Sequence, residues 1–416
     1  MINVDISNLW TCISLPELLG SEQDIFNAHN ILRDNQPDGP DFHSWLGLPD
    51  SVTGRLVHSI RRVADQIRSD SGILVVCGTG SIWRGARAAV ELWSSGQPQS
   101  AWVLFAGDSL SGRQWLELTT LVETNDFSLL IISDDGLGIG PNVTARGLRW
   151  IMERKYGSKA KERISVATVV GSPLHRMGQE EGYELFPLPR QLGGSSSVLT
   201  AAALIPMAVA GLDPIDVLEG AREAWTETDI RSFENPAWLY AAARHVLRSK
   251  GRTRELMCIT DRSLSSFCDW WRYHAWKHER SLFPDTVLLP EGLRPLDRLA
   301  ADRAAILETV LYFDPTGQRI PVEMDWKDYD GLGFLSGKTL DFVETELRSA
   351  LIEQHNELGV PIVEIQCGQL TGQTLGQLFC LFELSSALTA VLAGDDPFRP
   401  VPAASLEAAL ARMGGM

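Results

Sequence analysis

Short apolar runs alternate with amphipathic segments along most of the chain. In the first half these runs are rich in aliphatic and β-branched residues, which is typical of strands buried in a parallel sheet. They predict strands at 73–77, 101–105, 127–133 and 164–170. Between them, apolar residues recur at helical spacing and predict helices at 53–68, 83–93, 112–123 and 143–154. This alternation indicates a doubly wound α/β unit.

A helical stretch and a second α/β unit follow. The pattern over 197–248 is almost wholly helical, with Pro206 and Pro214 as interruptions. Further strands are predicted at 255–260, 286–289, 308–313 and 361–366, with helices at 265–279, at 339–357 and then up to 392. The fold class is therefore α/β, with two parallel-sheet domains joined by a helical connector.

The length of the chain supports this division. A chain of 416 residues is too long for one ordinary core, and 44% hydrophobic residues are enough to build two. We predict an N-terminal arm at 1–50, a first domain at 51–192, a connector at 193–254, a second domain at 255–395 and a C-terminal tail at 396–416.

Composition and charge exclude several classes of function. The first residues lack a basic region followed by a long apolar run, and no membrane span is predicted, so we expect a cytoplasmic protein. The net charge of −16 argues against a nucleic-acid partner. The six cysteines form no C-x-x-C pair and are expected to be buried free thiols. No metal-binding or hydrolase motif is present, so we expect no metal and no cofactor.

A glycine-rich loop after the first predicted strand is one candidate binding site. Gly78, Thr79, Gly80 and Ser81 lie between the strand at 73–77 and a helix. Backbone N–H groups at such a turn favour anionic or polar oxygens of a small-molecule ligand. The alternative is that the glycines only permit a tight turn.

Several segments carry a resemblance to a known family. Residues 191–220 read QLGGSSSVLTAAALIPMAVAGLDPIDVLEG, 45–49 read WLGLP, 73–89 read ILVVCGTGSIWRGARAA and 396–398 read DPF. These segments resemble the phosphoglucose isomerase family, with its G-G-R-F-S-V-L, W-x-x-L-P, G-I-G-G-S-x-x-G-A-R-A and N-P-F motifs. The resemblance implies two sugar-isomerase-type (SIS) domains. It also implies a homodimer in which each subunit helps to build the other's site.

The resemblance also shows that binding positions have changed. Ser195 stands where the family has an arginine near the reacting oxygens of the sugar. The family's phosphate loop, S-K-[ST]-G-x-[ST]-x-E-P, is similar to residues 133–141, which keep Ser133 but have Asp134 and Asp135 in place of lysine and a hydroxyl residue. Two carboxylates would repel a dianionic phosphate. They either cap the following helix or bind an ammonium or guanidinium group.

The catalytic positions have changed as well. The family's W-W-K-Q-L-x-x-E-S motif is similar to the segment that starts at Trp270, and it puts Lys277 at the position of the proton-shuttling glutamate. His278 and Glu279 follow, but a shift to Glu279 would turn the side chain by about 200° around the helix. Arg294 stands at the position of the ring-opening histidine.

Three hypotheses follow from these replacements. The chain is a phosphoglucose-isomerase-fold enzyme with other chemistry on a non-phosphorylated, possibly cationic small molecule in a specialised biosynthetic pathway; or a catalytically inactive relative that binds or regulates; or an aldose–ketose isomerase with shifted catalytic residues. Lys277 is either a functional amine or a solvated helix residue. A site plugged by Trp83 would favour the second hypothesis.

Overall fold

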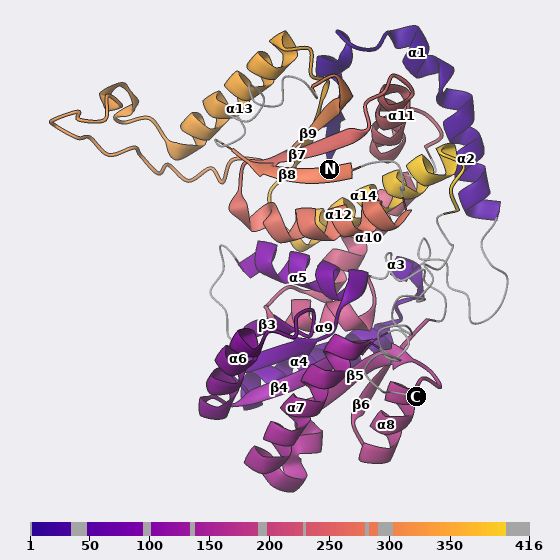
Figure 1. The fold of residues 1–416 in the computed structure, drawn as a ribbon, viewed down its shortest axis with the longest axis vertical. Helices are drawn as coiled ribbons and strands as arrows, with labels where there is room; N and C mark the ends of the chain where they lie inside the picture. Colours follow the sequence, from indigo (N-terminus) through magenta and orange to yellow (C-terminus); the bar gives the residue numbers. More distant parts are fainter. Residues whose placement is uncertain are drawn as a thin grey trace.

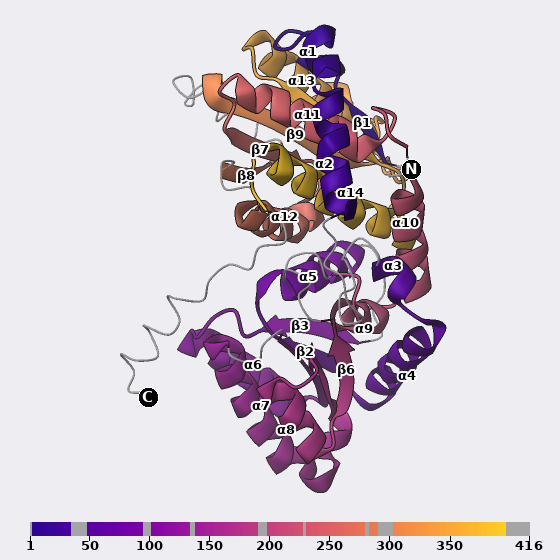
Figure 2. The ribbon, with the colours of Figure 1, turned by 90° about the vertical axis from the view of Figure 1, so that its right-hand side faces the viewer.

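The computed structural model describes residues 2–34, 48–94, 101–133, 138–189, 198–227, 230–278, 283–289 and 303–396. Two α/β domains are stacked along the long axis of the molecule (Figures 1 and 2). Each contains a five-stranded sheet. The predicted fold class is confirmed.

The first sheet is parallel throughout, with strand order β3-β2-β4-β5-β6. Its strands are β2 (Ile73–Cys77), β3 (Trp102–Ala106), β4 (Phe127–Ser133), β5 (Ile164–Val169) and β6 (Glu184–Leu188). Four of them match the predicted strands to within one residue. The sequence pattern did not predict β6, because Pro187 weakens it as a strand; the proline is tolerated at the edge of a sheet.

Helices cover both faces of this sheet, as the buried side chains show. One face packs against α4 (Gly54–Asp70), α5 (Gly80–Ser94) and α9 (Ala201–Val209). The other face packs against α6 (Gly112–Thr124), α7 (Ile139–Tyr156) and α8 (Pro173–Glu181). α9 continues through Pro206, which was predicted to interrupt the helix.

The strand order determines where a ligand can bind. The chain runs from β2 outward to β3 and then returns to β4 on the other side of β2. The loops after β2 and β4 therefore diverge to opposite faces at the carboxyl end of the sheet. In open α/β sheets, ligands bind in the crevice at this switch point.

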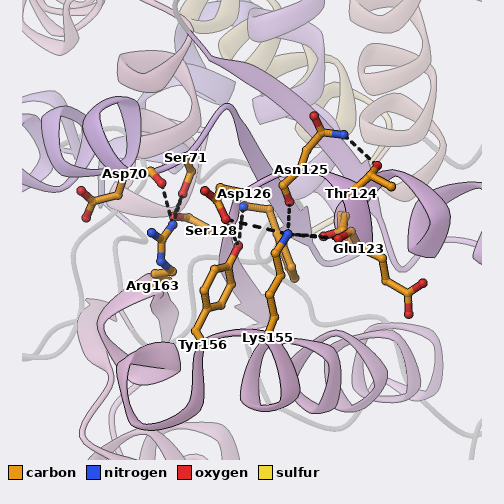
Figure 3. A network of polar contacts seen from close by, with 12 residues as sticks. Asp70, Ser71, Glu123, Thr124, Asn125, Asp126, Ser128, Lys155, Tyr156 and Arg163 are labelled. Atoms are coloured by element: carbon orange, nitrogen blue, oxygen red, sulfur yellow. Dashed lines mark hydrogen bonds and ion pairs between the residues drawn. The ribbon is translucent and has the colours of Figure 1, made fainter.

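Polar contacts close the opposite, amino end of the sheet (Figure 3). Lys155 donates to the carbonyls of Val122, Glu123 and Asn125 at the end of α6. Arg163 donates to the Asp70 carbonyl and the Ser71 hydroxyl, which in turn contacts Ser128 in β4. Because the polar groups at the amino end bond to one another, the carboxyl end of the sheet is the better candidate for a ligand-binding site.

The second sheet has the order β1-β10-β9-β7-β8. Its strands are β1 (Asn3–Asp5), β7 (Arg254–Ile259), β8 (Phe283–Leu288), β9 (Ile306–Phe313) and β10 (Ile362–Cys367). β8, β7, β9 and β10 repeat the arrangement of the first sheet. β1 is antiparallel to β10, so the N-terminal segment, predicted as an arm, extends the sheet of the second domain.

The N-terminal and connector helices also pack mainly on the second domain. Those around it are α1 (Leu15–Gly20), α2 (Glu22–Asp34), α10 (Pro214–Glu227), α11 (Pro236–Ser249), α12 (Ser265–His278), α13 (Leu340–Glu357) and α14 (Gly372–Leu392), and the short α3 (Leu48–Ser51) touches α10. Within the predicted connector, α9 packs on the first domain, whereas α10 and α11 pack on α14. The connector therefore belongs to both domains.

α14 is the central helix of the second domain. By length and a mean hydropathy of 1.6 it could cross a membrane, the one such helix in the described ranges, but 89% of its apolar window is buried inside the fold. Such burial is typical of a core helix in a soluble protein. The six cysteines are free, as predicted, and only Cys12 is partly accessible.

Candidate functional site

The domains meet where α5 packs antiparallel to α12. The Ser266 hydroxyl on α12 donates to Glu91 near the end of α5. Arg84 lies two turns before Glu91 on α5, and Tyr273 lies two turns after Ser266 on α12. The guanidinium of Arg84 stacks over the ring of Tyr273, 5.0 Å from the ring centroid. One more turn in the same register brings position 277 level with Gly80 and Ser81.

Two polar groups on this face of α5 have no partner among the described residues. Ser81 is only 2% exposed, and its hydroxyl makes no hydrogen bond. The Nε of Arg84 is also buried without an acceptor. By contrast, Arg87 one turn later donates through Nε to Glu91 at 2.6 Å. Buried polar groups without partners are uncommon and indicate a missing ligand, water or ion.

Trp83 does not face α12. Its indole N–H donates to the carbonyl of Val76 at 3.2 Å, and its ring makes an edge contact with Phe105 in β3. A Cβ atom added to Gly78 would lie 2.9 Å from this ring, so the glycine lets the tryptophan pack under the loop. Trp83 is therefore a core residue on the sheet side of α5 and does not plug the junction with α12.

The loops after β2 and β4 are adjacent, as expected for the switch point. Ser133 ends β4, the neighbour of β2. At the other end of the β4 loop, Gly138 precedes α7, and a Cβ atom there would lie 4.0 Å from the methyl group of Thr79. The backbones of Gly107 after β3 and Gly78 also touch, because a Cβ on Gly107 would lie 2.8 Å from the Gly78 carbonyl.

The remaining predicted site residues are described only in part. Lys277 and His278 lie in the last turn of α12, and only their backbone is described. Glu279, Arg294, Asp134, Asp135 and Ser195 lie outside the described residues. The segment that contains Ser195 re-enters at Val198, which packs directly on Gly85 of α5. The described flanks Gly138 and Val198 thus lie near Thr79 and Gly85, at the start and in the first half of α5.

Neighbouring groups are structural. His274 is buried and stacks on Trp270. Burial raises the pKa of the Cys77 and Cys268 thiols to about 12, so both stay protonated and unreactive at neutral pH. In the described ranges, no group of three or more His, Cys, Asp or Glu side chains is placed to hold a metal ion.

Comparison with known proteins identifies the family. The chain is 32% identical over 413 residues to a glucose-6-phosphate isomerase of Bacillus cytotoxicus, a match that covers 95% of this chain and 92% of that protein. A glucose-6-phosphate isomerase of Bacillus cereus is 31% identical over 415 residues, with the same coverage. The chain belongs to the glucose-6-phosphate isomerase family. No protein-family model matches the sequence.

Solved structures of low sequence identity share the fold of this family. A hypothetical protein of Thermus thermophilus matches with a TM-score of 0.87 at 18% identity, over 100% of this chain and 99% of that chain. A glucose-6-phosphate isomerase from Chlamydia trachomatis matches with a TM-score of 0.76 at 15% identity, over 95% of this chain and 84% of that chain. The family resemblance read from the motifs is confirmed.

Sequence reasoning predicted Ser81 as a site residue but missed Arg84 and Tyr273. Arg84 falls on an unspecified position of the family motif G-I-G-G-S-x-x-G-A-R-A, so no motif could point to it. Its place in the site depends on its contact with Tyr273 of α12, which comes much later in the chain. The only local signal is the helical spacing of Ser81 and Arg84, which puts both on one stripe of α5.

Proposed function

We propose that this member of the glucose-6-phosphate isomerase family is an enzyme that has lost aldose–ketose isomerisation. It acts at the α5–α12 junction on a non-phosphorylated polar small molecule, in a specialised biosynthetic pathway. The observation that carries the proposal is the lysine at position 277. This position lies level with Gly80 and Ser81 in the helix register, and the family's motif has a glutamate there.

The chemistry of these residue types supports the proposal. An ordinary glutamate, with a pKa of about 4.3, is ionised at neutral pH and can accept a proton, whereas an ordinary lysine, with a pKa of about 10.4, is protonated. Proton transfer between sugar carbons needs a base within hydrogen-bond reach. Trp83 favours an active enzyme over an inactive relative, because its indole packs on Phe105 and bonds to Val76 and so does not fill the α12 side of α5.

The first test is an isomerase assay. We expect no interconversion of glucose 6-phosphate and fructose 6-phosphate in a dehydrogenase-coupled assay, because no carboxylate base stands at position 277. The matched control is Glu279→Gln, which removes the carboxyl group nearest to position 277 in the sequence. Turnover in the usual range of about 1–1000 per second, abolished by Glu279→Gln, would restore the isomerase.

The second test concerns the charge of the ligand. Asp134 and Asp135, at phosphate-loop positions in the sequence, favour a ligand with an amine or guanidinium over its neutral or phosphorylated analogue. Calorimetry with amino acids, aminosugars and sugar phosphates should show this preference. Changing both residues to Asn should reduce it with little loss of stability. Tighter binding of a sugar phosphate than of every cationic compound would contradict the proposed charge pattern.

The proposal includes assembly as a homodimer. Residues 314–339 after β9 form an arm. At the base of the arm, backbone hydrogen bonds join Ile320 and Val322 to residues 337–340. Near its tip, Trp326 is 90% exposed and Tyr329 is 84% exposed. In Figure 1 the arm projects sideways from the second domain, on the same side of the molecule as β3 and α6 of the first domain.

The region around β3 and α6 suits this arm. β3 is an edge strand with partly exposed apolar side chains, and Val122 is the one fully buried residue of α6. Between α6 and α7 lies a cleft of about 960 Å³ that Trp115 and Trp150 help to line. A two-fold axis perpendicular to the long axis of the molecule would bring the arm of each copy onto the β3 and α6 region of the other copy.

A further inference from the structure

We infer that Arg84 is the anchor for a carboxylate group of the ligand. This inference rests on the proposed function, because it concerns the same α5–α12 junction. It adds the chemical class of one end of the ligand and a binding residue that the family's motifs do not specify.

The environment of Arg84 carries the inference. The guanidinium stacks on Tyr273 and, among the described residues, forms no ion pair, while its buried Nε has no acceptor. An arginine held in this way keeps its fixed positive charge and presents its other N–H groups in a rigid fork. Arg87, on the same helix, has a carboxylate partner in Glu91. Among the described residues, Arg87 of α5 therefore has a carboxylate partner, whereas Arg84 has none.

Ser81 provides a second, independent observation. It lies one turn before Arg84, on the stripe of α5 that faces α12, and its buried hydroxyl has no partner in the described part of the chain. It stands in the first turn of α5, where backbone N–H groups are exposed and the helix dipole favours negative charge. The Ser81 hydroxyl, the start of α5 and a guanidinium that has no ion pair in the described ranges lie in successive turns and together suit an anion.

A carboxylate fits this site better than a phosphate. The guanidinium fork binds a planar carboxylate in a bidentate arrangement, and because it binds phosphate oxygens in the same way, the choice between them depends on nearby charges. In the sequence, Asp134 and Asp135 stand at the phosphate-loop positions, where two carboxylates disfavour a dianion more than a monoanion. Val198 packs on Gly85, so the segment in which Ser195 replaces the family's arginine leads directly to this part of α5. Arg84 supplies a guanidinium there from a different element.

The test compares two probes that differ at one end. Gluconate carries a carboxylate where glucitol carries a neutral hydroxymethyl group. Calorimetry on the unmodified protein should show that gluconate binds at least about ten-fold more tightly, as a charge-assisted pair predicts. Arg84→Gln should abolish this preference, because gluconate binding should weaken much more than glucitol binding. The matched control Arg87→Gln, on the same helix, should keep it.

Opposite results would overturn the inference. Equal binding of the two probes to the unmodified protein, or an undiminished preference in Arg84→Gln, contradicts the anchor. If Arg84→Gln does not fold, as judged by circular dichroism, Arg84→Lys replaces it. That variant keeps the charge but lacks the fork, and should lower the preference several-fold; an unchanged preference would count against the anchor. Isomerase activity in the unmodified protein would overturn the proposed function alone, since the anchor is judged by binding.

Discussion

Glu383 is a carboxyl group enclosed in the core of the second domain. It lies on α14, its side chain is only 2% exposed, and its Oε1 has no partner among the described residues. Burial raises its pKa well above the ordinary value of 4.5, because the charged form is deprived of water. Above pH 4.5 the Glu383 carboxyl therefore stays protonated in the folded protein, whereas it loses its proton in the unfolded chain.

This raised pKa predicts how stability depends on pH. Because the folded pKa lies above the unfolded one, the contribution of Glu383 is fully present below pH 4.5 and is lost as the pH rises towards the folded pKa. Glu383→Gln, which cannot ionise, should raise the free energy of unfolding by about 1–3 kcal/mol at pH 8 and less at pH 5.

Urea unfolding at several pH values measures this difference, with Glu22→Gln on the surface of α2 as the control. If Glu383→Gln lowers stability by the same amount at every pH, then the carboxyl has a partner that stabilises its charge.

At the scale of elements, the contact of α10 with α14 depends on glycine. A Cβ atom on Gly376 would lie 2.0 Å from the carbonyl of Val217, and one on Gly220 would lie 1.9 Å from the carbonyl of Gln373. In both cases the obstacle is backbone, which no change of rotamer removes. This close approach joins the connector to the core helix of the second domain.

Gly376→Ala should therefore push the two helices apart. We expect a loss of about 1–3 kcal/mol or more in the free energy of unfolding, as is usual for overpacking. Gly54→Ala is the matched control, because Gly54 begins α4 and has nothing within 4 Å of its added Cβ. The control should change stability by less than about 0.5 kcal/mol. Equal melting temperatures for both variants would show that α10 and α14 can separate freely.

For the whole molecule, the exposed aromatic residues of the arm predict the state of assembly. If the protein forms the proposed homodimer, the double change Trp326→Ser and Tyr329→Ser should convert it to a folded monomer, because both side chains are exposed within one copy. Light scattering during size-exclusion chromatography measures the mass. Trp10→Ser, which changes an exposed tryptophan of the N-terminal segment, should leave the dimer intact.

Mixing two variants tests where the arm binds. Trp150→Glu in the α6–α7 cleft should also give a monomer, since it removes the surface for the partner's arm. A mixture of the arm variant and the cleft variant keeps one intact arm and one intact cleft, so it should form a heterodimer. If the mixture forms no heterodimer, then the arm does not bind the cleft, and each arm contacts the arm of the other copy. If the unmodified protein is a monomer, the proposed dimer is excluded.

The sequence by itself determined the elements and the family. Local periodicity predicted β2 and β4 at the bounds that the structure has, because a buried parallel strand must be apolar on both faces. Motif order identified the family, and it predicts replacements at Asp134, Ser195, Lys277 and Arg294. Weak strands escaped this reasoning: β1 has three residues and β6 contains Pro187.

Only the tertiary structure decided which side chains share the site. Arg84 follows no motif, and neither its contact with Tyr273 nor its lack of a partner among the described residues can be seen until α12 lies against α5; the same holds for the partnerless hydroxyl of Ser81. The sequence likewise left open whether Trp83 plugs the site, and its contacts with Val76 and Phe105 turn it to the sheet. The physical reason is that periodicity is set by neighbours along the chain, whereas satisfaction of a buried polar group depends on residues that folding brings together.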